Sequence, residues 1–247
     1  MKALPRPKAI IFDLDDTLII SDATVRQAWN EACERYAREH PPLDPETIFQ
    51  AIREVAIWFW SDPTRHREGR NNMDRTRREL VLKAFENLEI DDPEGALGMA
   101  DWFSERRYEM IELFPGALET LKDVRKAGLG LGLLTNGEAS MQRRKIDQFQ
   151  LASYFDVIQI EGEKGIGKPE PEAYRMILES LQVAPEEAWI VGDNLEWEVI
   201  APQFLGIRAI WQNYYKRQIS DPSIKPDWIL DDISQFSQVL ELSLNNA

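Results

Sequence analysis

IIFDLDDTL, residues 10–18, is the stretch that decides the fold of this 247-residue chain. The apolar run Ala9–Phe12 predicts a strand buried on both faces, as strands in parallel sheets are. Asp13 and Asp15 follow at the point where this strand ends. Because ligands of open α/β folds bind at the carboxyl ends of the strands, the two acids indicate a site. Asp-x-Asp alone is equally compatible with a solvated turn.

Strand and helix patterns alternate along the second half of the chain. Further strands are expected at Leu129–Leu134, Val157–Ile160, Ala188–Val191, Ile207–Trp211 and Trp228–Leu230. The helices between and after them are expected to end near Lys126, Phe149, Leu181, Leu205 and Leu242. This alternation predicts an α/β fold, a Rossmann-like doubly wound parallel sheet with helices on both faces.

Residues 21–113 carry helical periodicity and little strand signal. Four helices are expected there, at about Val25–Ala37, Pro45–Trp60, Arg75–Leu88 and Pro93–Leu113. We therefore expect residues 1–20 and 114–247 to form one domain, with a helical bundle of residues 21–113 inserted into it.

The composition argues against some classes of binding partner. A net charge of −14 argues against nucleic acid polymers and anionic membranes, which repel an acidic surface. No run approaches the roughly 20 apolar residues that a membrane span needs. Cys33 is the sole cysteine, so no internal disulfide can form and a reducing cytoplasm is the expected location.

Three later stretches also place polar residues at the ends of predicted strands. Thr135-Asn136 follows one strand, Lys168 stands before a proline-opened helix, and Gly192-Asp193 ends another strand. Each has a simple structural alternative, namely an Asn-Gly turn, a surface lysine and a helix N-cap. Their common position at strand ends instead indicates one shared site.

A P-loop is the rival interpretation of one of these stretches. Gly162–Lys168 has the P-loop spacing and follows a predicted strand. A P-loop continues with Ser or Thr to hold Mg²⁺, but Pro169 stands there and supplies neither a hydroxyl nor an N–H. The sequence therefore disfavours a P-loop.

Taken in order, the motifs resemble those of the haloacid dehalogenase superfamily of phosphatases. The matching stretches are Asp13–Thr17, Thr135–Gly137, Gly167–Pro169 and Gly192-Asp193, and they span the whole predicted core. The helical insertion lies where the family's helical-cap branch carries its cap domain.

Other stretches look like particular branches of that superfamily. Leu134–Gly137, Gln142–Ile146 and Tyr154–Asp156 resemble the N-acylneuraminate-9-phosphatase and nucleotidase-type branches.

The resemblance implies Mg²⁺-dependent hydrolysis of a small phosphomonoester. Asp13 would attack phosphorus and become an aspartyl phosphate, and Asp15 would act as general acid and then as general base. Thr135, the N–H of Asn136 and Lys168 would bind the phosphate oxygens.

The resemblance also implies a metal site. Mg²⁺ would be held by Asp13, the backbone carbonyl of Asp15, and Asp193. The family commonly has a second Asp five residues after Asp193; here that residue is Glu198, one methylene longer. We expect Glu198, with Asn194, to act at most through a metal-bound water.

Some alternatives remain open at this point. A phosphomutase, a dehalogenase or a non-catalytic phosphate-binding member would share the fold, although a departing halide needs no proton from Asp15. The substrate and the oligomeric state are not indicated. The cap offers Trp58, Trp60, Arg65, His66, Arg67 and Arg70, with the aromatic residues expected in the bundle core and the arginines on a solvated face.

Overall fold

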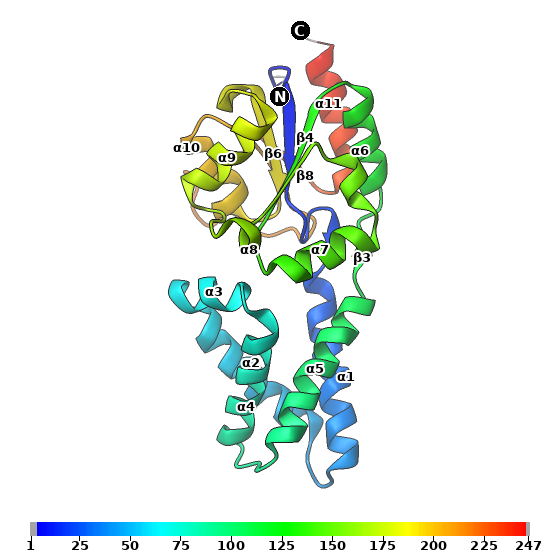
Figure 1. Ribbon diagram of the computed structural model, residues 1–247, viewed down its shortest axis with the longest axis vertical. Helices are drawn as coiled ribbons and strands as arrows, with labels where there is room; N and C mark the ends of the chain where they lie inside the picture. The colour runs from blue at the N-terminus through cyan, green and yellow to red at the C-terminus, as the bar shows by residue number, and fades with distance from the viewer. Residues whose placement is uncertain (1–3, 246–247) are drawn as a thin grey trace. The chain divides into compact units, whose positions relative to one another are not determined.

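The structure is a computed structural model that describes residues 4–245 (Figure 1). The chain divides into two compact units. The first unit contains the chain up to Ile20 together with everything from Leu113 onward, and the second contains Ser21–Glu112.

The first unit is built on a parallel sheet. Within the described residues this sheet has the order β5 (Val157–Ile160), β4 (Gly130–Thr135), β1 (Ala9–Phe12), β6 (Ala188–Gly192), β7 (Arg208–Gln212) and β8 (Trp228–Leu230). Every neighbouring pair is parallel. The predicted α/β class with a parallel sheet is confirmed.

Helices cover both faces of this sheet. They are α6 (Ala117–Lys126), α7 (Ala139–Gln148), α8 (Glu161–Lys164), α9 (Pro171–Leu181), α10 (Ala201–Phe204) and α11 (Phe236–Leu244). Figure 1 shows α9 and α10 on one face, with α6 and α11 on the other. Short 3₁₀ turns occupy Leu151–Tyr154, Pro185–Glu187 and Ile233–Gln235.

β1 is buried on both faces, as its apolar run predicts. Ile11 belongs to the cluster that includes Tyr174 and Ile177 of α9. Phe12 packs edge-on against Phe236 of α11, with ring centroids 5.5 Å apart. The central strand is therefore held between two helical layers, which fixes the position of the residues that follow it.

The helix expected to end near Leu205 is not a continuous α-helix. A π-helical segment, Leu195–Ile200, leads into the short α10 instead. Pro202 has no N–H to donate to the carbonyl four residues earlier, so the α-helical hydrogen-bond pattern cannot run through this position.

The second unit has five helices rather than the four expected. They are α1 (Asp22–Glu39), α2 (Pro45–Trp60), α3 (Pro63–Arg70), α4 (Met73–Asn87) and α5 (Pro93–Glu109). α3 was not expected, because Asp62-Pro63 indicates the end of a helix. The same pair also begins one: the Asp62 side chain accepts a hydrogen bond from the N–H of Arg65 at 2.8 Å.

The chain passes between the two units through two short strands. β2 (Ile19–Ile20) pairs with β3 (Glu112–Leu113). The last helix of the insertion therefore ends at Glu109, earlier than the expected Leu113. Two-residue strands are too short for the alternating pattern that identifies strands in a sequence.

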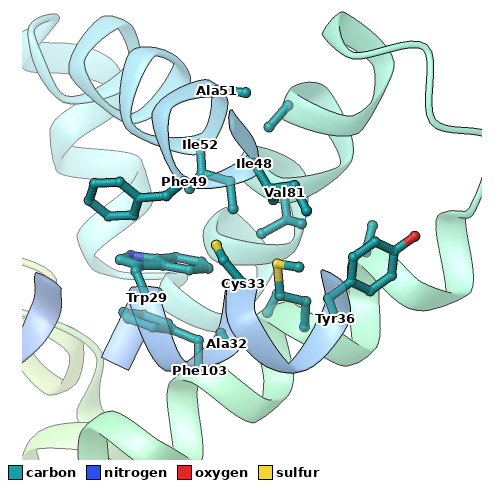
Figure 2. Packing of buried hydrophobic residues seen from close by; sticks show 14 of the residues in the cluster. Trp29, Ala32, Cys33, Tyr36, Ile48, Phe49, Ala51, Ile52, Val81 and Phe103 are labelled. Atoms are coloured by element: carbon teal, nitrogen blue, oxygen red, sulfur yellow. The ribbon is translucent and has the colours of Figure 1, made fainter. Parts of the chain in front are cut away.

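An aromatic stack forms the core of the second unit. Figure 2 shows the Trp29 ring between the rings of Phe49 and Phe103. The Trp29 and Phe103 rings are stacked with centroids 3.7 Å apart. Cys33 lies in the same cluster, and burial raises the pKa of its thiol to about 12. At neutral pH Cys33 is therefore an inert core residue.

None of the helices in residues 4–245 is both long enough and apolar enough to cross a membrane. The expected cytoplasmic location stays a prediction.

Candidate active site

The sequence motifs come together at the carboxyl edge of the sheet. β1 lies between β4 and β6, with Phe12 opposite Leu133 and Val191. Asp13 therefore leaves the sheet between the strands that end in Thr135 and in Gly192. Its N–H donates to the carbonyl of Val191 at 3.0 Å, which fixes the direction of the chain at that point.

Lys168 forms a buried bridge between two acids. Its ammonium lies 2.5 Å from Asp13 Oδ1 and 2.7 Å from Glu198 Oε1. Burial alone would lower the pKa of Lys168, but the two carboxylates outweigh it and raise that pKa above its ordinary value. Lys168 is therefore a permanent cation next to Asp13.

The side chain of Asn136 holds the backbone of Lys168. Its amide nitrogen donates to the Lys168 carbonyl at 2.7 Å, and its oxygen accepts from the Lys168 N–H at 2.8 Å. The loop after β4 is thus tied to the loop between α8 and α9. Asn136, expected to act through its own N–H, has this second role through its side chain.

The Asp13 carboxyl is buried, and its surroundings shift its pKa in opposite directions. Burial raises the pKa of its carboxyl, the Lys168 ammonium lowers it, and the Asp15 charge raises it again, with a net increase. Thr17 adds a hydrogen bond from its hydroxyl to Asp13 Oδ2 at 3.3 Å. The ionised form of Asp13 therefore depends on nearby positive charge.

Asp15 has its own cation, which the sequence analysis did not identify. Lys145 of α7 donates to both carboxylate oxygens of Asp15, at 2.8 and 2.9 Å. Gln142, one turn earlier, donates to Asp15 Oδ2 at 2.9 Å and to the Thr135 hydroxyl at 2.5 Å. The spacing of Gln142, Lys145 and the buried Ile146 is that of one helix face, so two polar residues on an inward face were the available signal.

Glu198 fits beneath Gly192. A Cβ on Gly192 would lie 2.0 Å from Glu198 Cγ, so a side chain at position 192 would displace this glutamate. Glu198 also accepts from the N–H of Asn194 at 2.9 Å. The Asn194 side chain caps the π-helical segment by accepting from the N–H groups of Glu196 and Trp197. The expected link of Asn194 and Glu198 to a metal-bound water stays a prediction.

The end of β7 and the residues directly after it form hydrogen bonds with two acids of the site, Asp16 and Asp193. Arg217 donates to Asp193 Oδ2 at 2.9 Å, and Tyr215 donates to Asp16 Oδ1 at 2.9 Å. Gln212 donates to the carbonyls of Asp16 and Thr17. This segment holds the loop that follows β1 and had no motif in the sequence.

The carboxylates at this edge suit a cation. The pKa of Asp193 is raised to about 8, first by burial and then by the charges of Glu198, Asp13 and Asp16, while Arg217 lowers it. A divalent ion beside Asp13 and Asp193 would reverse this repulsion. Within residues 4–245 no three His, Cys, Asp or Glu side chains gather as a metal-binding group. The expected ligand set needs only two carboxylates and one backbone carbonyl, so the residues fit.

The glycine-rich stretch does not form a P-loop. Gly162 and Lys164 lie within the short helix α8, and the Lys168 ammonium is occupied by two carboxylates. A P-loop lysine instead extends toward the phosphates of a nucleotide.

The second unit contains a separate cleft of about 550 Å³ between α1 and α2. It is lined by Trp29, Phe49, Arg26 and Arg53, among others. Arg26 stacks over the Phe49 ring, with its guanidinium carbon 5.8 Å from the ring centroid.

Trp58, Trp60 and Arg65 lie outside the lining of that cleft. Trp58 is 58% exposed, so its expected place in the core is wrong, whereas Trp60 packs partly buried against the core. The Arg65 guanidinium covers the Trp58 ring and donates to the Trp58 carbonyl at 2.7 Å.

Curated relatives match nearly the full length of the chain. A phosphoserine phosphatase of Thermus thermophilus is 32% identical, covering 92% of this chain and 97% of the relative. A glyceraldehyde 3-phosphate phosphatase of Pyrococcus furiosus is 29% identical, covering 96% and 94%. The N-acylneuraminate-9-phosphatase of Mus musculus is 25% identical, covering 96% and 95%, so the expected likeness to that branch is confirmed.

Solved structures share the fold. A 2-haloacid dehalogenase from Pseudomonas syringae pv. Tomato superimposes with a TM-score of 0.65 at 26% identity, covering 95% of this chain and 98% of that one. The haloacid dehalogenase-like hydrolase family matches residues 7–206. The chain therefore belongs to the haloacid dehalogenase-like hydrolases.

Proposed function

We propose that the first unit hydrolyses a small phosphomonoester through a phosphoryl group carried transiently on Asp13. One observation carries the proposal: the Asp13 carboxylate, at the end of the central strand, is in contact with the buried cation Lys168. Thr135 ends the adjacent strand, and Asp193 directly follows the strand on the other side. A nucleophile, an electrophilic cation and a hydroxyl donor are what phosphoryl transfer requires.

In the first step, an oxygen of Asp13 forms a bond to phosphorus as the bond from phosphorus to the ester oxygen breaks. The departing alkoxide takes a proton from the Asp15 carboxyl group. Lys168, Thr135 and the Asn136 N–H hold the non-bridging oxygens throughout.

In the second step, the Asp15 carboxylate takes a proton from a water molecule whose oxygen attacks phosphorus. The bond between phosphorus and Asp13 breaks, which releases inorganic phosphate and regenerates both acids. The need for a proton donor separates this reaction from dehalogenation, because a halide leaves as a stable anion.

Mg²⁺ is the proposed cofactor. Asp13, Asp193 and the carbonyl of Asp15 would hold it, and it would supply positive charge for the transferring phosphoryl group. The support is the raised pKa of Asp193, which burial and then the nearby charges of Glu198, Asp13 and Asp16 produce.

The substrate class follows from the relatives. Their substrates, as their names give them, are phosphoserine, glyceraldehyde 3-phosphate and a phosphorylated acylneuraminate. We propose a small phosphorylated metabolite for this chain, and three-carbon phosphate esters are the first to assay.

Trapping of the intermediate tests the mechanism. After a rapid acid quench during turnover of p-nitrophenyl phosphate, mass spectrometry should find a phosphoryl group on the peptide that contains Asp13. Asp13→Asn keeps the shape but removes the nucleophile, and should lower turnover by ~10⁴-fold or more. A label on another peptide, or substantial turnover by Asp13→Asn, would overturn the proposal.

A further inference from the structure

The helix α7 brings two buried polar side chains to the acid that the mechanism uses twice. Gln142 and Lys145 lie one turn apart, 2% and 7% exposed. Burying an ammonium without partners is costly, so a lysine at this depth needs a compensating acid. Asp15, on a loop distant in the sequence, provides it.

The hydrogen bonds of this group are directional. The ammonium of Lys145 donates to both oxygens of Asp15 and to Gln142 Oε1, the last at 2.7 Å. The two amide hydrogens of Gln142 are matched by Asp15 Oδ2 and Thr135 Oγ1. Contact with both oxygens of Asp15 restricts rotation of its carboxylate, which a single hydrogen bond would not do.

The contact with Thr135 sets the direction of its hydroxyl. Because the Thr135 oxygen accepts from Gln142, its own hydrogen must point elsewhere. Its acceptor in the structure is the Asn136 carbonyl at 3.4 Å, a long and weak contact. A phosphoryl oxygen at this strand end would be a better acceptor.

We propose that Lys145, supported by Gln142, is the positioning residue for the general acid and base Asp15, and that Gln142 also aims the Thr135 hydroxyl at the phosphoryl group. This inference rests on the proposed function. Lys145 itself would touch neither the substrate nor the reacting atoms. It would act by holding the Asp15 carboxylate where it can reach first the leaving oxygen and then the attacking water.

Leaving-group dependence makes this role measurable. p-Nitrophenolate leaves readily without a proton, so a misplaced Asp15 should hardly slow formation of the phosphoenzyme from that ester. Its hydrolysis still needs the base. An alkyl ester needs Asp15 in both steps.

Lys145→Met keeps the length of the side chain and removes the ammonium. With p-nitrophenyl phosphate we expect a burst of p-nitrophenolate close to one per enzyme, then a steady rate about 10–100-fold below the unaltered enzyme, because small misplacements of catalytic groups cost up to about 10²-fold. Acid quench should show the phosphoenzyme accumulating. With an alkyl phosphate, turnover should fall at least as far without such accumulation.

Three further variants separate positioning from folding. Lys145→Arg keeps the cation and should recover part of the lost rate. Arg143→Met removes a cation from the same helix, one that bonds Glu163 instead, and should leave both rates within about twofold. Gln142→Met should weaken inhibition by inorganic phosphate about 3–10-fold, the scale of one lost hydrogen bond.

Failure of the proposed function and failure of the positioning role would give different results. If the unaltered enzyme shows no phosphoryl group on Asp13, the proposed function is wrong. If that label forms but folded Lys145→Met shows no burst and loses rate equally on both esters, or loses none, the positioning role is overturned. Thermal unfolding of each variant shows whether it is folded. If Lys145→Met does not fold, Gln142→Met decides the test, and unchanged kinetics and phosphate inhibition in that folded variant would overturn the role.

Discussion

The two units bury different kinds of side chain. In the first unit, charged side chains lie within the protein with polar partners: Lys168 pairs with Glu198, and Lys145 pairs with Asp15. In the second unit, the interior is mainly apolar around Trp29, while Arg26 and Arg53 lie on the exposed faces of their helices.

This difference predicts which side chains can be replaced without loss of folding. Removing one partner of a buried ion pair leaves an uncompensated charge and is strongly destabilising. Exposed side chains can be replaced at little cost to folding. We infer that the buried ion pairs of the first unit tolerate little change, whereas exposed residues of the second unit can be replaced without loss of folding.

After Asp13→Asn, the largest effect is expected at Asp15. Asp15→Asn keeps the volume but removes the proton donor and base, which should lower turnover of alkyl phosphates by about 10²–10⁴-fold. p-Nitrophenyl phosphate should still form the phosphoenzyme, measured as a burst of p-nitrophenolate. Equal losses in the burst rate and in alkyl ester turnover would show that Asp15 serves the fold rather than the proton transfers.

A smaller effect is expected at Asp193, as a change in metal affinity. We expect Mg²⁺ to bind only the folded protein and so to raise the melting temperature of the unaltered enzyme, and chelation by EDTA should reverse this and abolish turnover. Asp193→Asn loses a charged ligand and should bind Mg²⁺ at least about 10–100-fold more weakly, the scale seen even for changes around a metal's ligands. Asp156→Asn is a control, since Asp156 bonds Arg125 and Leu131 at the opposite end of β4.

Two observations would contradict the prediction of a metal site at Asp193. A melting temperature that does not respond to Mg²⁺ would argue against the metal site. An unchanged Mg²⁺ titration in Asp193→Asn would move the site away from Asp193.

The smallest effect is expected in the cleft of the second unit. If Arg26 and Arg53 meet an anionic part of the natural ester, Arg53→Ala should raise KM for that ester about tenfold, as the loss of one charge-assisted hydrogen bond does, and change kcat little. p-Nitrophenyl phosphate lacks that group and should be hydrolysed with an unchanged KM. Arg65→Ala is the matched control, because Arg65 bonds the Trp58 and Phe59 carbonyls at the end of α2.

A KM increase of equal size for both esters would show that Arg53 does not select the leaving group. An increase confined to Arg65→Ala would place recognition near Trp58 instead of in the cleft.

The sequence predicted the parallel sheet because burial on both faces leaves a clear apolar run, as in Ala9–Phe12. It predicted the residues at the strand ends because turns and acids interrupt those runs. The prediction of helices was less accurate where one sequence signal is compatible with two structures. Asp62-Pro63 ends one helix and begins another, so α3 was missed.

Contacts between distant segments were beyond prediction from local patterns. Lys145 and Asp15 are 130 residues apart in the chain, and only the fold reveals that they pair. Arg217 and Asp193 are 24 residues apart, and their pairing likewise depends on the fold. A lone lysine on a helix is more often solvated than buried, so its spacing on one helix face with Gln142 and Ile146 was too weak a signal to single it out.

The reciprocal bonds between Asn136 and Lys168 have a practical consequence for protein engineering. The amide side chain does here what a neighbouring strand's backbone would do, offering one donor and one acceptor to a single residue. The two loops therefore form one structural unit, although they belong to different stretches of the chain. A designer who transplants this site into another scaffold would have to move residues 135–137 and 167–169 together, because either loop alone would lose the template that shapes it.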